Sequence, residues 1–83
     1  MPELLYTKHA LDVLHERQIP PEWVERVVAS PALVEHEEDG TVHCIAPIVE
    51  QDNRLLRVVL AGEPKPYRVV TVFFDRRLRR KGL

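Results

Sequence analysis

Four polar side chains of this sequence carry the groups that a phosphodiester reaction would need: His43, Arg57, Tyr67 and Thr71. An arginine guanidinium binds phosphate oxygens in a bidentate fashion, and a histidine or tyrosine beside it can move a proton. A ribonuclease that works without metal uses this inventory, with a base for the ribose 2′-hydroxyl and cations that stabilise the charged transition state. We therefore take His43, Arg57 and Tyr67 as candidate catalytic residues. The alternative, which the residues alone favour, is that they only keep a solvent-facing sheet surface polar.

Opposite charges are sorted into two halves of the chain. Residues 1–53 hold eleven acids and three bases, a net of −8, whereas residues 54–83 hold nine bases and two acids, a net of +7. A basic half of this kind indicates a polyanionic partner such as RNA, DNA or an acidic protein segment. The candidate nucleic-acid contacts are all arginines: Arg57, Arg68, Arg76 and Arg77. The alternative is that the two halves pair with each other in the folded protein.

The metal-ligating residue types are scattered rather than clustered. His9 and His15 are too far apart to share one face of a helix at the spacing that chelates a metal, and His36 stands alone among acids. His43 and Cys44 are neighbours in a predicted strand, so their side chains point to opposite faces. The chain has three glycines and no glycine-rich phosphate loop. The sequence therefore predicts no metal and no cofactor, and it predicts that the lone cysteine is an inert core residue.

These side chains must be positioned by elements that the periodicity predicts. A short apolar run at 4–6 indicates an edge strand, and Thr7 is a suitable N-cap for a helix that ends near residue 17. The proline pair at 20 and 21 ends that helix region and starts a second helix over 21–29. Near residue 32 the apolar spacing changes from the helical period to the alternation of strands.

The second part of the chain predicts four strands joined by short turns. They cover 33–37, 41–48, 54–61 and 67–74, and Asp39-Gly40 is a strong hairpin signal between the first two. Short turns make consecutive strands antiparallel neighbours. We predict an α+β fold in the order β-α-α-β-β-β-β, with both helices on one face of an antiparallel sheet of four to five strands. Residues 1–75 form one domain in this prediction, and residues 76–83 form a basic tail that is expected to fray.

Alternation assigns the strand residues to two faces of the sheet. The predicted core face is apolar and consists of Val42, Cys44, Ala46, Leu56, Val58, Leu60, Val70, Val72 and Phe74. The opposite face is predicted to be open and consists of His43, Ile45, Arg57, Val59, Tyr67, Thr71 and Phe73. A shift of one residue in register would exchange the members of these two lists.

The stretch from His9-Ala10-Leu11 through Glu16-Arg17-Gln18-Ile19-Pro20-Pro21 to Pro31 resembles the opening of a bacterial family known only as domain of unknown function 4258. Val69-Val70-Thr71-Val72-Phe73 is similar to the end of its curled antiparallel sheet. The resemblance implies a relation to the RelE/ParE and BrnT toxin fold, whose best-known members cut mRNA and are silenced by an antitoxin. His9, Arg17 and Thr71 are the matched polar positions, and no catalytic role is transferred to them.

Two classes of function follow. The first is a small RNA-binding or RNA-cleaving protein, at its sharpest a metal-independent mRNA endoribonuclease held by an acidic antitoxin-like protein. The second is a module without enzymatic activity that binds a partner or associates with a second copy of itself. No apolar run is long enough to span a membrane, and the first residues do not read as a signal peptide. With a single cysteine, these features predict a cytoplasmic protein, and the family resemblance implies a bacterial one.

Overall fold

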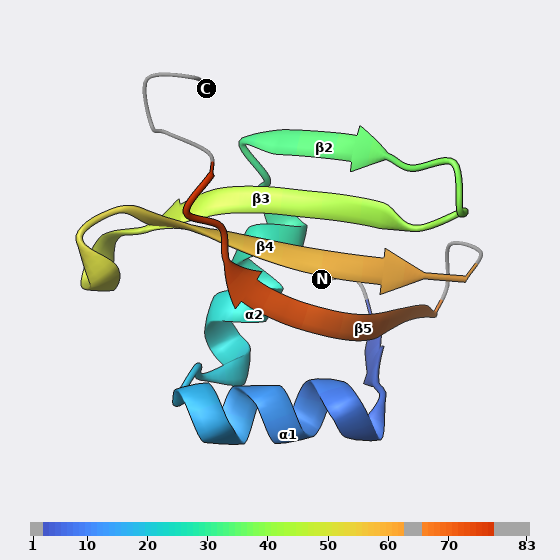
Figure 1. Ribbon diagram of the computed structural model, residues 1–83, viewed down its shortest axis with the longest axis horizontal. Helices are drawn as coiled ribbons and strands as arrows, with labels where there is room; N and C mark the ends of the chain where they lie inside the picture. Colours follow the sequence, from blue (N-terminus) through green and yellow to red (C-terminus); the bar gives the residue numbers. More distant parts are fainter. Residues whose placement is uncertain (1–2, 63–65, 78–83) are drawn as a thin grey trace.

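The computed structural model describes residues 3–62 and 66–77, and all statements on the fold refer to them. Along the chain these residues form β1 (Leu4–Tyr6), α1 (Lys8–Arg17), α2 (Pro21–Ala29), β2 (Leu33–His36), β3 (Val42–Ile48), the 3₁₀ turn η1 (Val49–Gln51), β4 (Arg54–Ala61) and β5 (Tyr67–Phe74). The strands make one sheet in the order β1-β5-β4-β3-β2, and both helices lie on one of its faces (Figure 1). The predicted α+β fold and element order are confirmed.

The helices begin and end where the sequence predicts. The Thr7 hydroxyl accepts a hydrogen bond from the Ala10 amide at 3.0 Å, which caps α1, and donates to the Val70 carbonyl on β5 at 3.2 Å. Gln18 ends α1 in the left-handed conformation, with φ of 55°. Pro20 then precedes α2, whose first residue is also proline. The N-cap therefore fixes the helix and its attachment to the last strand with one side chain.

The sheet is mixed, which corrects the expectation of a wholly antiparallel sheet. β2 to β5 pair antiparallel with their neighbours, but β1 pairs parallel with β5, with Leu4 opposite Tyr67. Short turns dictate antiparallel pairing only for strands that follow one another in the chain. β1 and β5 lie at opposite ends of the sequence, so no turn constrains their relative direction.

A β-bulge shifts the register at the N-terminal end of β5, so the residues there lie on the opposite face from the one predicted. Val58 pairs with Val72 as expected, but Leu60 pairs with Val69, because the register shifts between Val59 and Leu60. Val70 is the extra residue, and beyond it the alternation of β5 is inverted. Val69 is therefore fully buried in the core where Val70 was predicted, and Tyr67 packs against that core instead of lying on the opposite face.

The core lies between the helices and the sheet, and its members include Trp23, Val24 and Val27 of α2. Around them the buried residues are Ala10, Leu14, Ile19, Cys44, Ala46, Ile48, Leu56, Val58, Leu60, Val69 and Val72. Cys44 is a buried free thiol, and burial raises its pKa, as expected for an inert core cysteine.

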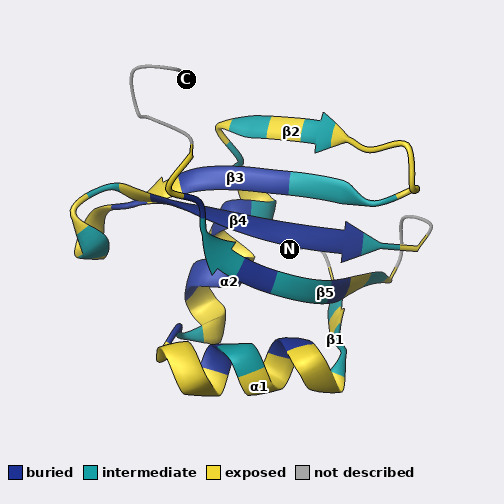
Figure 2. Ribbon diagram, viewed as in Figure 1, coloured by how far each residue is buried: buried dark blue, intermediate teal, exposed yellow. Residues whose placement is uncertain are grey.

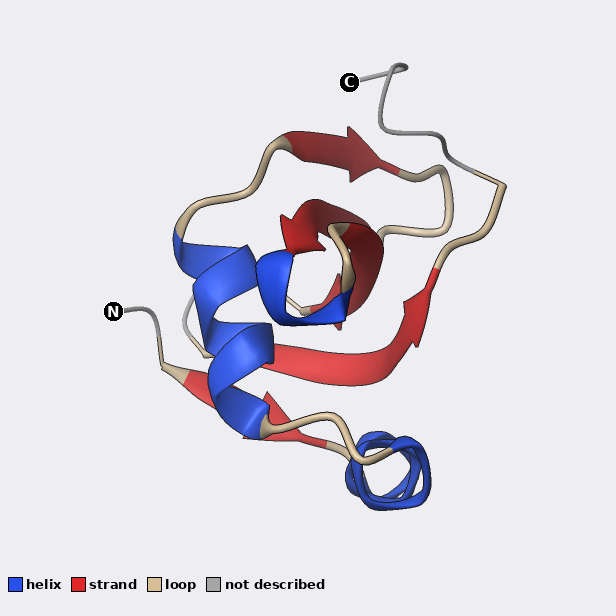
Figure 3. Cartoon of the chain, turned by 90° about the vertical axis from the view of Figure 1, so that its left-hand side faces the viewer, coloured by secondary structure: helices blue, strands red, loops and turns tan. Residues whose placement is uncertain are grey.

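The opposite face of the sheet is not open at its centre, which corrects the sequence assignment. Six consecutive residues of β4 are buried, so both faces of this strand are covered (Figure 2). Ile45, Val59 and Arg57, which were assigned to an open face, are 0%, 7% and 6% exposed. The sheet is strongly curled (Figure 3), and the side chains of β2 and of the segment after β5 reach its middle strands. This second face therefore holds a buried charged cluster.

Candidate functional site

Arg57 is the centre of the buried charged cluster. Its Nε–H donates to Asp75 Oδ2 at 2.8 Å, and its Nη1 group donates to Glu35 Oε1 at 2.9 Å and to His43 Nδ1 at 2.8 Å. The three partners come from β2, β3 and the residue that follows β5. We call Glu35, His43, Arg57 and Asp75 the Arg57 cluster. It joins three separate segments of the chain through one guanidinium.

The contacts of His43 define its protonation. Arginine is only a donor, so His43 Nδ1 must accept from Arg57 and the ring proton must reside on Nε2. That N–H donates to Thr41 Oγ1 at 3.2 Å, and the Thr41 hydroxyl donates to Asp39 Oδ1 at 2.6 Å. Both ring nitrogens of a neutral His43 are therefore engaged. A general base needs a free lone pair directed at its substrate, which this arrangement does not offer.

Arg57 and the two carboxylates of the Arg57 cluster stabilise one another in the charged state. Burial lowers the pKa of the Arg57 guanidinium, but its hydrogen bonds with Glu35 and Asp75 more than reverse this, so the pKa lies above its usual value. Burial raises the pKa of the Asp75 carboxyl, and the hydrogen bonds from Arg77 and Arg57 more than reverse that, so the pKa lies below its usual value. Arg57 is thus a charged residue with its partners already in place, and it is not free to bind phosphate.

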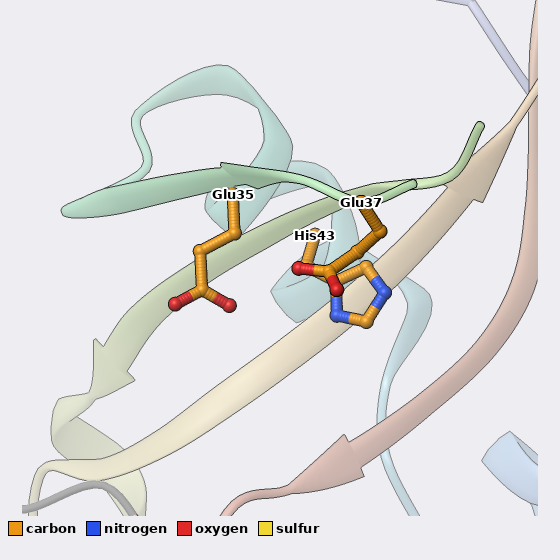
Figure 4. Close-up of side chains that lie close together, drawn as sticks. All are labelled: Glu35, Glu37 and His43. Atoms are coloured by element: carbon orange, nitrogen blue, oxygen red, sulfur yellow. The ribbon is translucent and has the colours of Figure 1, made fainter. Parts of the chain in front are cut away.

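A group with metal-like spacing borders the same cluster. The ligand atoms of Glu35, Glu37 and His43 lie within 4.8 Å of one another, and Figure 4 shows the two carboxylates on one side of the strands with the His43 ring beside Glu37. The Nη1 group of Arg57, however, already donates to two of these three residues. A guanidinium therefore occupies the place of a cation, and these residues do not fit a divalent metal while Arg57 is present.

Apart from the Arg57 cluster, several arginines line a groove at one end of the sheet. The groove has a volume of about 450 Å³ and is lined by Arg17, Gln18, Trp23, Gln51, Arg54, Phe74 and Arg76. We call it the arginine groove. Trp23 and Phe74 belong to the core between helices and sheet, so the groove lies on the helix-bearing side, away from the Arg57 cluster.

Ends of elements converge on the arginine groove. Arg17 is the last residue of α1, and Arg54 is the first residue of β4, after a turn in which Asp52 and Asn53 both have φ of 60°. Leu56 pairs with Phe74, and the Asp75 amide donates to the Leu55 carbonyl at 2.9 Å. Continuing this register carries Arg76 across from Arg54. Each guanidinium thus comes from a different segment, and each is exposed.

The groove arginines are not neutralised by the part of the protein that the structure describes. Among residues 3–62 and 66–77, Arg17, Arg54 and Arg76 form no ion pair. Arg26, in contrast, binds both carboxylate oxygens of Glu50, at 2.8 and 3.0 Å. The contact that Arg54 does make is with an aromatic ring, because its guanidinium carbon lies 4.3 Å from the centroid of Phe74. The groove is therefore a concentration of positive charge over an aromatic floor.

The residues predicted to act on RNA are not all brought together. His43 and Arg57 are in contact, but Tyr67 packs with the core on the other side of the sheet because of the bulge in β5. Of the predicted nucleic-acid contacts, Arg76 lies in the arginine groove and Arg77 lies beside Asp75.

Arg68 is exposed near the start of β5, at the end of the strand away from the groove. The matched polar residues separate as well. His9 Nε2 lies 3.4 Å from the Thr71 hydroxyl, whereas Arg17 lies in the groove.

Arg54, Gln18 and Gln51 are the polar groove residues that sequence reasoning did not single out for function. A signal for them exists in the order of the elements. Arg17 ends a helix, Arg54 starts a strand, and Arg76 follows the last strand, and in an antiparallel hairpin the start of one strand lies beside the end of the next.

The fold and the groove define a small α+β domain with a cationic recess at one end of a mixed sheet. The chain belongs to the family described as Domain of unknown function (DUF4258), whose model matches residues 6–74. No curated protein and no solved structure matches the chain. The relation to RelE/ParE and BrnT toxins therefore stays a prediction. Within the described residues, none of the helices has the length and apolar character needed to cross a membrane.

Proposed function

We propose that this protein binds single-stranded RNA through the arginine groove. The observation that carries the proposal is the convergence of Arg17, Arg54 and Arg76 on one groove without an ion pair to any described carboxylate. Like charges brought together in this way repel one another and destabilise the folded protein. An anion placed among them removes that repulsion and forms charge-assisted hydrogen bonds with the guanidinium groups.

The aromatic floor supports a nucleotide rather than a simple anion. The Arg54 guanidinium lies over the Phe74 ring, which leaves its outer face available to a base, and bases stack on guanidinium planes as they do on aromatic rings. Gln18 and Gln51 add amide groups that both donate and accept hydrogen bonds, as base edges require. A recess admits an unpaired nucleotide more readily than it admits a duplex, whose bases are stacked inside. These features favour a single strand.

Fluorescence anisotropy with a labelled oligouridine tests the proposal. We expect Arg54→Ala to weaken binding by about tenfold, the loss of one charge-assisted contact, and to flatten the dependence of log K on log salt by about 0.7, the value for one phosphate on a single strand. Arg68→Ala is the matched control, because it removes the same charge from the same basic half at the far end of β5. It should change the affinity by less than about twofold.

Each other outcome of this experiment is informative. An equal loss of affinity in both variants would show that RNA is attracted by the charge of the basic half as a whole and not bound in the groove. Binding that ignores salt would exclude phosphates as the ligand. Preference for an acidic peptide over RNA would favour a protein partner of the antitoxin type, and equal binding of DNA would remove the preference for RNA. A concentration-dependent dimer without RNA binding would favour a self-associating module.

Cleavage is not part of this proposal. His43, Arg57 and Tyr67 remain the hypothesis that the sequence supplies for a ribonuclease. Their arrangement does not favour it, because Tyr67 lies on the other side of the sheet and the His43 ring nitrogens are both engaged.

A further inference from the structure

Asp75 connects the Arg57 cluster to the arginine groove. It follows β5 directly, and its side chain is 2% exposed. One carboxylate oxygen accepts from Arg57 Nε at 2.8 Å, and the other accepts from the Arg77 amide at 2.9 Å and from Arg77 Nε at 3.4 Å. Its own amide donates to the Leu55 carbonyl at 2.9 Å. The amide and both carboxylate oxygens of Asp75 therefore have partners, on Leu55, Arg57 and Arg77.

These bonds fix the backbone on both sides of Arg76. The amide of residue 75 is held by β4, and the amide of residue 77 is held by the Asp75 carboxylate, so the turn between them spans Arg76. The carboxylate is itself held by the buried guanidinium of Arg57. Arg76, which is exposed, lines the groove from this anchored turn.

We infer that Asp75 is a positioning residue that presents Arg76 to the anion in the arginine groove, an inference that rests on the proposed function. An arginine whose backbone is already held in place loses less conformational freedom when a ligand arrives, so the anchored turn raises affinity without touching RNA. Arg57 contributes to the same positioning indirectly, because it binds the Asp75 carboxylate that accepts from the Arg77 amide. The buried cluster thus acts on the exposed groove.

Electrostatics and positioning make opposite predictions for Asp75. A carboxylate near an anion site repels the anion, so its removal by Asp75→Asn should tighten binding if charge alone matters. If Asp75 positions Arg76, the same change should weaken binding, since asparagine has only one acceptor oxygen and can no longer accept from both Arg57 Nε and the Arg77 amide. The sign of the change in affinity separates the two effects.

The experiment measures labelled oligouridine affinity for the wild type, Asp75→Asn, Arg76→Ala and the double variant. We expect Asp75→Asn to weaken binding several-fold. The double variant should bind no more weakly than Arg76→Ala, because both substitutions act on the same contact, that of Arg76 with the RNA. Asp39→Asn is the matched control: Asp39 also accepts from the amide two residues on, at 2.9 Å from Thr41, but does not line the groove. It should leave affinity unchanged or slightly tighter.

A second pair of variants avoids the buried core altogether. Arg77→Pro and Arg77→Ala remove the same exposed side chain, but only the proline removes the amide that binds Asp75. Arg77→Pro should bind the oligouridine several-fold more weakly than Arg77→Ala. The inference is overturned if the two bind alike, or if folded Asp75→Asn binds as well as or better than the wild type. If Arg54→Ala also has no effect, the proposed function fails too; if it does weaken binding, only the positioning role is lost.

Discussion

Arg54 and Arg57 belong to the same strand, β4, and have opposite surroundings. Arg57 is buried and bound by two carboxylates and a histidine, whereas Arg54 is exposed and touches an aromatic ring. Their spacing places them on opposite faces of the sheet. The same residue type therefore stabilises the fold at one position and remains available to a ligand at the other.

Pairing between the acidic and basic halves, one of the two interpretations of the charge pattern, accounts for Arg57 but not for the groove arginines. The pair between Glu35 and Arg57 joins the acidic half to the basic half, as expected if the halves neutralise each other. The groove arginines draw on both halves, since Arg17 comes from the acidic one, and they are not neutralised within the described chain. The net charge of a segment therefore indicates where the charged residues lie in the sequence. It does not indicate which of them form ion pairs in the folded protein.

The largest expected effect comes from substitution of the buried arginine, Arg57. Arg57→Met should lower the free energy of unfolding by about 3 kcal/mol, because it leaves the buried Asp75 carboxylate without its buried guanidinium partner. Arg54→Ala should change it by less than about 1 kcal/mol, because the loss of one exposed cation–π contact is offset by relief of the repulsion among the groove arginines. Urea unfolding of both variants measures the difference. Equal losses would show that burial and pairing do not distinguish the two arginines.

Truncations in β5 test the packing of the sheet that lies between the Arg57 cluster and the arginine groove. Val72→Ala should cost about 2 kcal/mol through lost burial and a cavity, because Val72 is fully buried opposite Val58. Val70→Ala should cost clearly less, since Val70 is the extra residue at the bulge and is only partly buried. The two denaturation midpoints give the comparison. A greater loss for Val70 would contradict the bulge.

Acid acts on the buried cluster through Asp75. The folded-state pKa of Asp75 lies below its unfolded-state value of about 3.9, so its contribution to stability is fully present above that pH. The contribution is lost as the pH falls through the folded-state pKa. The urea midpoint of the wild type should therefore fall more steeply on acidification below about pH 4 than that of Asp75→Asn. Parallel curves for the two proteins would remove Asp75 from the acid response.

The smallest expected effect is that of metal. An excess of Zn²⁺, or a chelator, should leave the melting temperature within about 1 °C, because the Arg57 guanidinium already lies between Glu35 and His43. Differential scanning fluorimetry measures this directly. Stabilisation by Zn²⁺ would mean that the metal displaces Arg57, and the same titration on Arg57→Met would then show the stronger response.

Local patterns predicted the elements, but contacts between distant segments set the site. The Thr7 cap, the proline pair and the switch to alternation are each visible within a few residues, and they give the element order. The parallel partner of β1 and the bulge at Val70 depend on strands far apart in the chain, so alternation alone misplaced Tyr67.

Arg57 was predicted to be an exposed contact, yet the curled sheet brings Glu35 and Asp75 onto it from two other segments. The arginine groove was only partly anticipated, through Arg17 and Arg76, because the meeting of element ends is a property of the assembled sheet.

The pairing of β1 with β5 has a consequence for synthesis on the ribosome. Thr7 and Val70, which are bonded to each other, are 63 positions apart, so this contact closes a loop that includes almost the whole chain. Both helices must bury their apolar faces against strands that emerge later. The nascent N-terminal half therefore exposes these faces until β5 has left the exit tunnel, and the sheet cannot be completed before then.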